Sequence, residues 1–187
     1  MPKSWKTFTP WILSTTSAIL STIPAHAVSY LSVDEAKKVC FSNANHFEKA
    51  HVIFSKEEIA AIEKITEQSN QTRGQRIWKA YQDQTFLGYF IIDQVIGKHE
   101  LIDYVIALDP EGNVKQVEIL NYRESYGYEV RSKHWRDQFV GKNCQSELEL
   151  HGDIVNIGGA TLSCRNVTRG VKKVLAVYET ILKEKNK

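Results

Sequence analysis

Cysteine is scarce in this sequence, and its scarcity excludes one class of protein. Three cysteines (Cys40, Cys144 and Cys164) in 187 residues are too few for a disulfide-rich scaffold. The odd number allows at most one disulfide, and either a Cys144–Cys164 bond or three unpaired thiols fits the sequence. His46 and His51 follow Cys40, but their spacing matches no common zinc motif, so we expect no metal site there.

A large net charge is also lacking. The chain has 24 basic and 22 acidic residues, and its first 27 residues hold two lysines and no acidic residue. The rest of the chain therefore carries equal numbers of the two signs. Nucleic acids and acidic membrane surfaces attract strongly basic proteins, so we expect neither as a partner.

Long hydrophobic runs are missing as well. The most apolar stretch, residues 11–20, is shorter than the ~20 residues of a membrane-spanning helix. It follows Lys3 and Lys6 and precedes Ala25-His26-Ala27, which has the small residues of a cleavage site. This pattern predicts a signal peptide over residues 1–27, cleaved after its last alanine. We therefore expect an exported protein, located in the periplasm of a Gram-negative bacterium.

Two helices are predicted between residues 28 and 74. Ser32-Val33-Asp34-Glu35 and Ser55-Lys56-Glu57-Glu58 both have the form S-x-x-E of a capping box, which is typical of a helix start. The first helix is expected to end near Phe41, and the second carries isoleucines at helical spacing. Residues 28–74 are therefore predicted to form an N-terminal helical extension.

Strands are predicted from Gln75 onward. Aromatic and β-branched residues are frequent in segments 86–96, 101–108 and 114–122, as in β-strands. Asp109-Pro110-Glu111-Gly112-Asn113 has the composition of a turn, since proline presets φ and glycine tolerates a positive φ. Consecutive strands joined by such short connections form an antiparallel meander.

A long amphipathic helix is predicted at the C-terminus. Apolar residues at helical spacing form one stripe from Val167 to Leu182. Before it, we expect a short helical stretch over residues 134–139 and a short strand over residues 146–150. The predicted fold is a two-layer α+β domain over residues 75–187, in which the antiparallel β meander packs against the C-terminal helix.

A stretch almost without side chains precedes this helix. Gly158, Gly159 and Ala160 lead to Thr161, and the helical spacing starts directly afterwards. The free N–H groups and the positive dipole at a helix start suit a phosphate, and glycine lets an anion approach the backbone closely. A left-handed turn followed by a threonine N-cap has the same sequence pattern. By themselves, these residues leave both interpretations open.

The same stretch, Ile157-Gly158-Gly159-Ala160-Thr161-Leu162-Ser163, resembles the S-G-A-T-x-[ST] motif of the FMN-binding domain family. This family includes the covalent-flavin subunits of the sodium-pumping NADH:quinone reductase and of Rnf-type electron-transport complexes, and small stand-alone periplasmic flavoproteins. Three other segments resemble family motifs in the same order: Asp109-Pro110-Glu111-Gly112 the central hairpin turn, Glu124-Ser125-Tyr126-Gly127-Tyr128-Glu129 the E-[ST]-x-G-x-[EG] loop, and Trp135 to Lys142 the W-x-x-Q-F-x-G-K segment. The likeness covers about residues 88–182, and four motifs in register are specific.

The resemblance implies a cofactor and a way of holding it. In this family the motif threonine is esterified by the phosphate of FMN, and a flavin transferase attaches the group from FAD; the acceptor here would be Thr161. Tyr126, Tyr128 and Trp135 would form a wall beside the flavin ring, with packing on the meander as the alternative. Lys142 would offset charge on the phosphate or the reduced flavin. The predicted FMN-binding residues are Gly158, Gly159, Ala160, Thr161, Leu162, Ser163, Glu124, Ser125, Tyr126, Gly127, Tyr128, Trp135 and Lys142.

Two positions depart from the family pattern. Gly158 stands where the motif has a serine, which removes a potential hydrogen bond to the phosphate. The transferase motif has an aspartate six residues before the threonine, where this chain has Val155. Asp153 lies eight residues before Thr161, which suits a stand-alone branch with the pattern D-I-x-x-I-S-G-A-T. Both departures concern the covalent attachment more than the binding of FMN.

The sequence thus predicts an exported flavoprotein that carries electrons through FMN, tethered by a phosphoester bond at Thr161. We expect a carrier or redox subunit rather than an enzyme with a substrate of its own. The expected partners are a flavin transferase for maturation and redox donor and acceptor proteins, free or within a membrane electron-transport complex. Two alternatives stay open: a flavin-free exported binding or adaptor domain of the same fold, and a reductase with non-covalent FMN.

Overall fold

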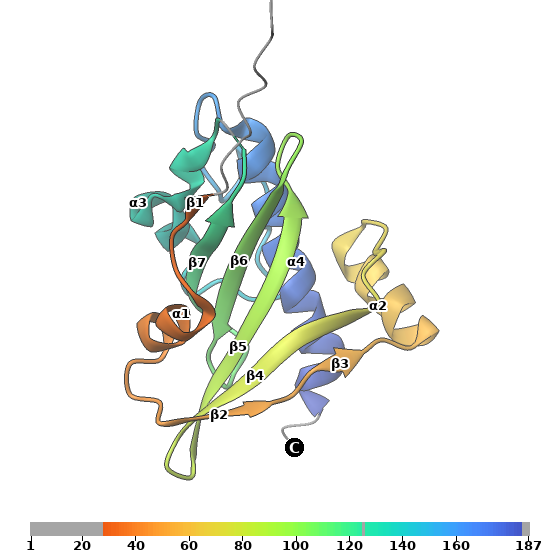
Figure 1. Ribbon diagram of the computed structural model, residues 1–187. Coiled ribbons are helices and arrows are strands. Elements are labelled where there is room, and N and C mark those ends of the chain that lie inside the picture. Colours follow the sequence, from red (N-terminus) through yellow and green to blue (C-terminus); the bar gives the residue numbers. More distant parts are fainter. Residues whose placement is uncertain (1–27, 125, 185–187) are drawn as a thin grey trace, which may run out of the picture.

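A computed structural model of the protein describes residues 28–124 and 126–184 (Figure 1). The predicted signal peptide, residues 1–27, lies outside the described residues. Within the described part of the chain, no helix is both long and apolar enough to span a bilayer. The fold is α+β, as predicted, and it is built on one twisted antiparallel sheet (Figure 1).

The two capping boxes begin two helices, as predicted. α1 (Val33–Cys40) follows Ser32, whose Oγ accepts a hydrogen bond at 3.2 Å from the N–H three residues later. α2 (Lys56–Thr66) follows Ser55, whose Oγ accepts the corresponding bond at 3.1 Å. In both boxes the glutamate at that later position accepts a bond from the serine N–H. Each box therefore satisfies two donors that a helix start otherwise leaves unpaired.

Four long strands form the predicted meander. β4 (Gly74–Gln82), β5 (Thr85–Ile96), β6 (Leu101–Leu108) and β7 (Val114–Tyr122) pair antiparallel in chain order. The turn over residues 109–113 joins β6 to β7 and is closed by a 2.9 Å hydrogen bond between backbone groups at its two ends. The sequence therefore predicted the centre of the sheet correctly.

Three short strands extend this meander at its edges. β1 (Val28–Ser29) pairs with β7, while β2 (His46–Lys49) and β3 (Val52–Ile53) both pair with β4. The sheet order is β1-β7-β6-β5-β4-β2, with β3 beside β4. The segment 28–74 thus contributes strands to both edges of the sheet in addition to its two predicted helices. These strands are short and largely exposed, so they lack the apolar alternation that predicts a strand.

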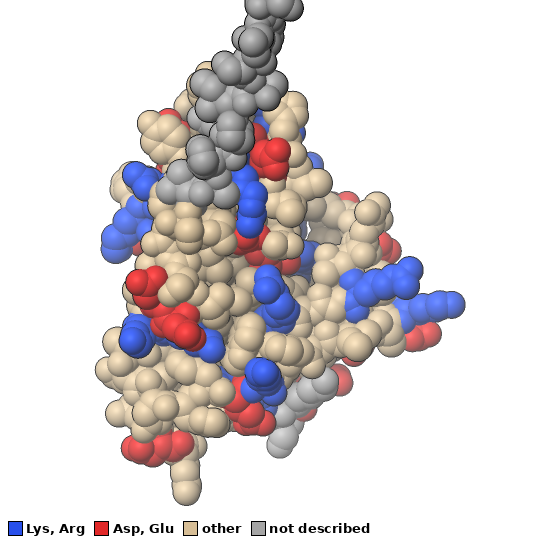
Figure 2. Space-filling view, in the orientation of Figure 1, with Lys and Arg blue, Asp and Glu red and all other residues tan. Residues whose placement is uncertain are grey.

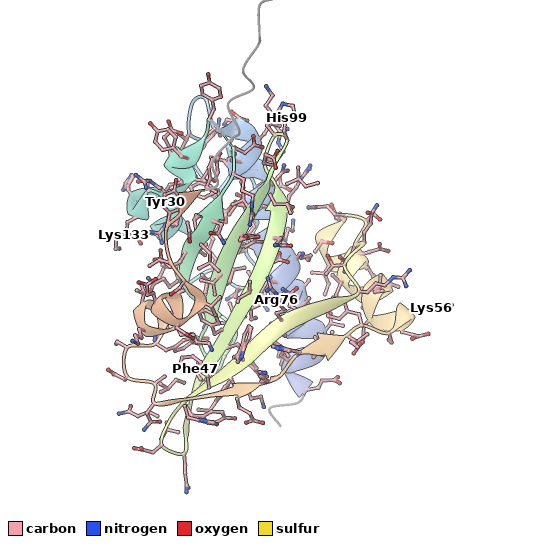
Figure 3. The ribbon with its side chains drawn as sticks, in the orientation of Figure 1. Tyr30, Phe47, Lys56, Arg76, His99 and Lys133 are labelled. Atoms are coloured by element: carbon pink, nitrogen blue, oxygen red, sulfur yellow. The ribbon has the colours of Figure 1, made fainter. Side chains whose placement is uncertain are left out.

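Helices cover both faces of the sheet. On one face lie α2, α4 (Thr161–Val177) and the π-helical turn that continues α4 over Tyr178–Leu182. On the other face α1 packs over the lower part of the sheet near Phe47 (Figures 1 and 3). Two layers were expected, and α1 adds a third because β5 and β6 are apolar on both faces. Side chains toward α4 include Tyr89, Ile91, Tyr104 and Ile106, and those toward α1 include Phe90, Ile92, Val105 and Ala107.

α4 is seated on the sheet at Gly170. A Cβ at this position would lie 1.9 Å from Tyr104 Oη, so the close approach requires a residue without a side chain. Tyr104 donates a 2.5 Å hydrogen bond to Asp93 Oδ2, and Lys173 of α4 pairs with Asp93 Oδ1 at 2.8 Å. This buried polar cluster fixes α4 along its axis and so places its first residue, Thr161, at one end of the sheet.

Short helices follow β7. A 3-10 turn over Tyr128–Arg131, α3 (Lys133–Arg136) and a second 3-10 turn over Asp137–Phe139 pack against that strand, which confirms the helical stretch predicted over residues 134–139. The expected strand over residues 146–150 does not form. Leu150 makes only an isolated bridge to Ile154.

All three cysteines are free thiols. Cys40, the last residue of α1, is buried in the core between α1 and the sheet, and Cys164 of α4 is buried in the core on the opposite face. Burial raises the pKa of the Cys40 thiol to about 12, so this thiol stays protonated and unreactive. Of the two arrangements that the sequence allowed, the structure has unpaired thiols.

Positive and negative side chains are interspersed on the face shown in Figure 2, and the described residues form no large area of one sign there. Among the described residues, opposite charges also pair directly: Arg123 lies 2.7 Å from Asp103, and Lys133 lies 2.7 Å from Asp137. The balance of charge in the sequence is therefore also a local balance on this surface.

Candidate functional site

The bare stretch before α4 forms a tight turn that leaves the helix start uncapped. Gly159 has φ +84°, a left-handed conformation that favours glycine, and the Ala160 N–H donates to the Ile157 carbonyl at 3.0 Å. Ala160 is the N-cap, and no side chain caps the helix. Thr161 is the first helical residue, so the structure has the left-handed turn of the alternative interpretation but not its threonine N-cap. The positive end of α4 is available to an anion.

A second loop lies directly against this helix start. Gly127 has φ +84°, and a Cβ there would lie 2.7 Å from Tyr122 Oη and 3.1 Å from Ser163 Oγ. The Ser163 hydroxyl donates to Tyr122 Oη at 3.0 Å, and the Tyr122 hydroxyl donates in turn to the Tyr126 carbonyl. Glycine at 127 therefore lets the loop after β7 pack on the first turn of α4. Two segments that resemble family motifs meet at this contact.

The tip of the β5–β6 hairpin forms the third wall of the site. Glu124 Oε1 accepts hydrogen bonds from the backbone N–H groups of Lys98, His99 and Glu100, the last at 2.9 Å. Asn166 of α4 donates to the carbonyls of residues 96 and 97 at 2.7 and 3.0 Å. Figure 3 shows His99 on this tip, at the end of the molecule where α4 begins.

The Glu124 carboxylate is held ionised by these contacts. Its partial burial raises the pKa, but the three backbone N–H groups and the nearby His99 lower it more, and the net pKa lies below its ordinary value. The carboxylate accepts its hydrogen bonds from the hairpin tip, so the role of Glu124 is to hold this wall of the site in place.

These three segments enclose a pocket of about 510 Å³ at the start of α4. This volume lies within the range of ~300–1,000 Å³ that is usual for small-molecule sites. Its lining mixes apolar groups with three hydroxyls, a carboxylate, a histidine and a lysine. The lining residues are Lys98, His99, Glu124, Tyr126, Gly159, Ala160, Thr161, Leu162 and Ser163.

Seven of the thirteen predicted FMN-binding residues line this pocket. Among the other six, Gly158 stands next to Gly159 and is exposed, and Gly127 supports the wall from behind. Ser125 lies outside the described residues. The pocket lining also omits Tyr128, Trp135 and Lys142. The seven that line the pocket are Gly159, Ala160, Thr161, Leu162, Ser163, Glu124 and Tyr126.

The three omitted residues have other contacts. The Trp135 side chain is buried against Phe139 and donates to the Val155 carbonyl at 2.9 Å. Lys142 pairs with Asp153 at 2.7 Å. Tyr128 is half exposed and lies beside the Arg131 guanidinium, 5.9 Å from the ring centre. In this structure Trp135 and Lys142 hold together the loops that lead to α4.

Sequence reasoning missed several residues of the site. Lys98 and His99 sit on a hairpin turn whose nearness to α4 depends on the register of the whole sheet, and no local pattern indicates it. Tyr122 was missed because in the sequence it resembles any other aromatic residue of a predicted strand. Asn156 was also missed, although its Nδ2 donates to Thr161 Oγ1 at 2.9 Å. The sequence feature that could have indicated Asn156 is its position: an amide side chain between two apolar residues, just before the bare turn.

The candidate metal ligands serve the fold. His51 Nδ1 accepts a 3.0 Å hydrogen bond from the Ile77 N–H, and its ring packs edge-on against Trp78. Among the described residues, no three His, Cys, Asp or Glu side chains gather as ligands for a metal ion.

Comparison with known proteins agrees with the motifs at this pocket. Residues 97–176 match the model of the FMN-binding domain. The chain contains an FMN-binding domain. The matched residues include the hairpin tip, the loop after β7 and the first turn of α4, which together build the pocket. No curated protein matches the chain.

A solved structure with a similar fold is the crystal structure of Shewanella oneidensis NqrC. The TM-score is 0.55 at 14% sequence identity, and the match covers 82% of this chain and 88% of that one. At this identity the likeness shows the fold alone. It extends beyond the FMN-binding domain match, because 82% of the chain includes part of the N-terminal segment.

The residues of the pocket fit FMN. A Cβ at Gly158 or at Gly159 would meet no atom within 4 Å, so the turn before Thr161 is open toward an incoming phosphate. The uncapped first turn of α4 presents donors and a positive dipole to that phosphate. Tyr126 and Leu162 offer an aromatic and an aliphatic surface for a flat apolar ring. The protein is therefore a flavoprotein of the FMN-binding type.

Proposed function

We propose that this protein is an exported electron carrier whose FMN is esterified to Thr161. The observation that carries the proposal is the position of Thr161. This hydroxyl lines the pocket at the uncapped start of α4, within the segment that matches the FMN-binding domain. The open turn before it gives a transferase access to the hydroxyl.

The attachment is a phosphoryl-group transfer with a balanced course. Thr161 Oγ1 attacks the phosphorus on the flavin side of FAD, and a new Oγ1–P bond forms. The bond from that phosphorus to the bridging oxygen breaks, AMP leaves with the electron pair, and a base of the transferase takes the hydroxyl proton. The products are the Thr161 phosphoester and AMP. The isoalloxazine ring is unchanged, and it supplies reversible electron transfer when bound.

The residues of this chain would bind and orient the group. The free N–H groups of the first turn of α4 would donate to a phosphate attached at Thr161. Lys98 is the lysine of the pocket lining, whereas Lys142 is paired with Asp153. We therefore assign the charge-balancing role to Lys98 in place of Lys142. Tyr126 is 83% exposed and can cover the ring while its edge stays open to a redox partner.

Exposed apolar side chains around the pocket offer a docking surface for that partner. Nine large apolar side chains are exposed among the described residues, and six of them belong to the ends of the β5–β6 hairpin loop, the loop after β7, the segment that leads into α4 or the first turn of α4. Exposed apolar groups gathered in one place mark interaction sites. We propose that a redox protein with an apolar face docks there and exchanges electrons with the flavin. The six residues are Ile96, Leu101, Tyr126, Tyr128, Val155 and Leu162.

Intact-mass measurement tests the covalent attachment. The protein is co-expressed with a flavin transferase as wild type, Thr161→Ala and Thr161→Ser. The wild type is expected to gain the mass of FMN less one water, and the serine variant, which keeps a hydroxyl, is expected to be labelled as well. Thr161→Ala should gain nothing. An adduct that persists in Thr161→Ala contradicts the proposed attachment site.

Reduction kinetics test the docking surface. Val155 is 69% exposed and lies outside the pocket lining, so Val155→Glu adds a charge to the segment that leads into α4 without entering the site. Reduction of the flavin-loaded protein by bacterial membranes supplied with NADH is expected to slow about tenfold, while reduction by dithionite, which needs no docking, stays unchanged. Equal slowing by both reductants, or by neither, contradicts the proposed surface.

Export is tested at the N-terminus of the mature protein. A protein recovered from the periplasmic fraction should begin at Val28. A mature chain that still begins at Met1 contradicts the predicted cleavage.

A second function, a reductase with non-covalent FMN, is favoured by the contacts of Asp153. This carboxylate is the nearest acidic residue before Thr161, and it is engaged within the fold. It pairs with Lys142 at 2.7 Å and accepts a 3.0 Å bond from the Glu149 N–H. A transferase that must contact this carboxylate would find it occupied. Yellow colour released by acid precipitation, with turnover of a small acceptor, would support this second function.

A further inference from the structure

Asn156 makes a contact with Thr161 that the family motif does not include. Its Nδ2 donates a 2.9 Å hydrogen bond to Thr161 Oγ1, from a residue five positions earlier in the chain. The turn between the two residues contains Gly158 and Gly159 and closes through the 3.0 Å bond from Ala160 N–H to the Ile157 carbonyl. The amide therefore reaches across the base of the turn to the hydroxyl.

The other polar atom of the same amide is buried without a partner. Asn156 Oδ1 is inaccessible to water and has no hydrogen-bond partner among the described residues. An amide can exchange its oxygen and nitrogen by a half-turn, but either orientation leaves one of them unpaired. A buried unpaired polar atom costs stability and calls for an explanation beyond the fold.

We propose that Asn156 is the positioning residue for Thr161 and supplies the hydrogen bond that Gly158 cannot. This inference rests on the proposed function, in which Thr161 receives the phosphate of FMN. The family motif has a serine at position 158, which could donate a hydrogen bond to the phosphate, whereas this chain has no side chain there. The Asn156 amide, held on Thr161 Oγ1, replaces that missing donor.

One orientation of the amide serves both states of the threonine. Before attachment, the donated hydrogen bond fixes the direction of Thr161 Oγ1 and leaves its own hydrogen free for the base of the transferase. When the Oγ1–P bond forms and AMP leaves, the oxygen has no hydrogen and can only accept. Nδ2 can then continue to donate to the ester oxygen or to a phosphate oxygen beside it. A carboxylate at position 156 could not do so, and it would repel the phosphate.

The space around Gly158 makes the exchange of donors testable. A Cβ at 158 would meet no atom within 4 Å, and φ at this residue is not in the left-handed region. A serine therefore fits there without strain. If Asn156 replaces the serine of the family, adding that serine should compensate for the loss of the amide.

The experiment measures the initial rate of FMN attachment by intact mass, with FAD and a purified transferase. Asn156→Ala and Asn156→Asp are expected to slow labelling on the order of tenfold or more, the factor expected when a hydrogen bond to a charged group is lost. Asn156→Ala combined with Gly158→Ser should recover most of the rate. The control is Asn143→Ala, which loses a 3.1 Å side-chain bond to Asn113 beside the start of β7 and a 3.0 Å bond from the Gln145 N–H. The first turn of α4 instead contacts Tyr122 at the end of that strand, through Ser163.

The outcomes separate this inference from the proposed function. A wild type that is never labelled contradicts the covalent function itself. A labelled wild type with unchanged rates in both Asn156 variants overturns the inference. Loss of labelling in Asn156→Ala that Gly158→Ser does not restore also overturns it, since a purely structural role for the asparagine predicts that result. Asn156→Asp keeps the size of the side chain, so it tests the donor even if the alanine variant fails to fold.

Discussion

The glycines within the fold and the glycines before Thr161 have opposite surroundings. A Cβ at Gly170 would lie 1.9 Å from Tyr104 Oη, and one at Gly112 would lie 2.0 Å from the Tyr178 ring. A Cβ at Gly158 or Gly159 would meet nothing within 4 Å. Within the fold, glycine makes room for a neighbouring side chain. Before α4, it leaves room that no group of the protein fills.

This difference indicates which glycines serve a ligand. Packing alone explains Gly170, because α4 could not approach β6 otherwise. The left-handed φ of Gly159 requires glycine there, but neither packing nor φ explains Gly158 on this exposed turn, where glycine costs conformational entropy and stabilises nothing by contact. The next residue, Gly159, lines the pocket together with Thr161, so access to the Thr161 hydroxyl is a sufficient reason for a bare turn.

Gly170→Ala is expected to have the largest effect on stability. The new methyl group would overlap Tyr104 Oη and disturb its bond to Asp93. Overpacking of this kind costs about 3 kcal/mol, which exceeds the ~1 kcal/mol that alanine gains over glycine in a helix. Urea denaturation of the protein without flavin measures the change. A variant as stable as the wild type would show that the contact of α4 with the sheet is loose.

Gly127→Ala is expected to have the next largest effect, about 2 kcal/mol, from a left-handed backbone and an overlap together. Its Cβ would lie 2.7 Å from Tyr122 Oη, so the loop should also move away from α4 and FMN labelling should fall. Gly141→Ala is the matched control, because Gly141 has φ +79° but nothing within 4 Å. The two variants share the backbone strain, and their difference in unfolding free energy isolates the overlap. Equal losses would remove the packing argument for Gly127.

The centre of the fold could be predicted because its signals are local. Each capping box places its serine and glutamate three residues apart, and the sheet confirms the strands that β-branched and aromatic residues predicted. β2 and β3 were missed because they are short and exposed, and they form only by pairing with β4. Their pairing depends on the path of the chain after α1, which no pattern within four residues can specify.

The candidate site was predictable where motif residues line the pocket themselves, as Thr161 and Tyr126 do. It was not predictable where a wall comes from a distant segment. Lys98 and His99 reach the pocket only because Glu124, some 25 residues later, binds their backbone N–H groups. Trp135 belongs to a motif of the family, yet its indole supports Val155 from outside the pocket. A motif thus locates a site without separating the residues that line it from those that hold it in place.

Glu124→Gln is expected to weaken the framework of the site in a pH-dependent way. The pKa of Glu124 is lowered in the folded state, so its carboxylate contributes stability that is fully present above its ordinary pKa of 4.5 and is lost as the pH falls through the lower, folded value. The effect should stay below about 1 kcal/mol, because solvent screens a group this accessible. Unfolding free energies of both proteins should differ at pH 7 and converge toward pH 3. A constant difference over this range would assign the loss to geometry instead of charge.

Gly158→Ala should change stability least of all, by less than about 0.5 kcal/mol. Its Cβ meets no atom, its φ is not left-handed, and the residue is exposed, so neither overlap nor strain arises. Thermal unfolding of the protein without flavin measures this change in stability. The contrasting variant is Gly170→Ala, whose substitution lies within α4 itself. A marked loss of stability in Gly158→Ala would mean that the protein itself fills the space before α4. Unchanged stability with altered FMN labelling would mean that the space exists for the cofactor and its transferase, since only a group from outside the chain can then sense the added methyl.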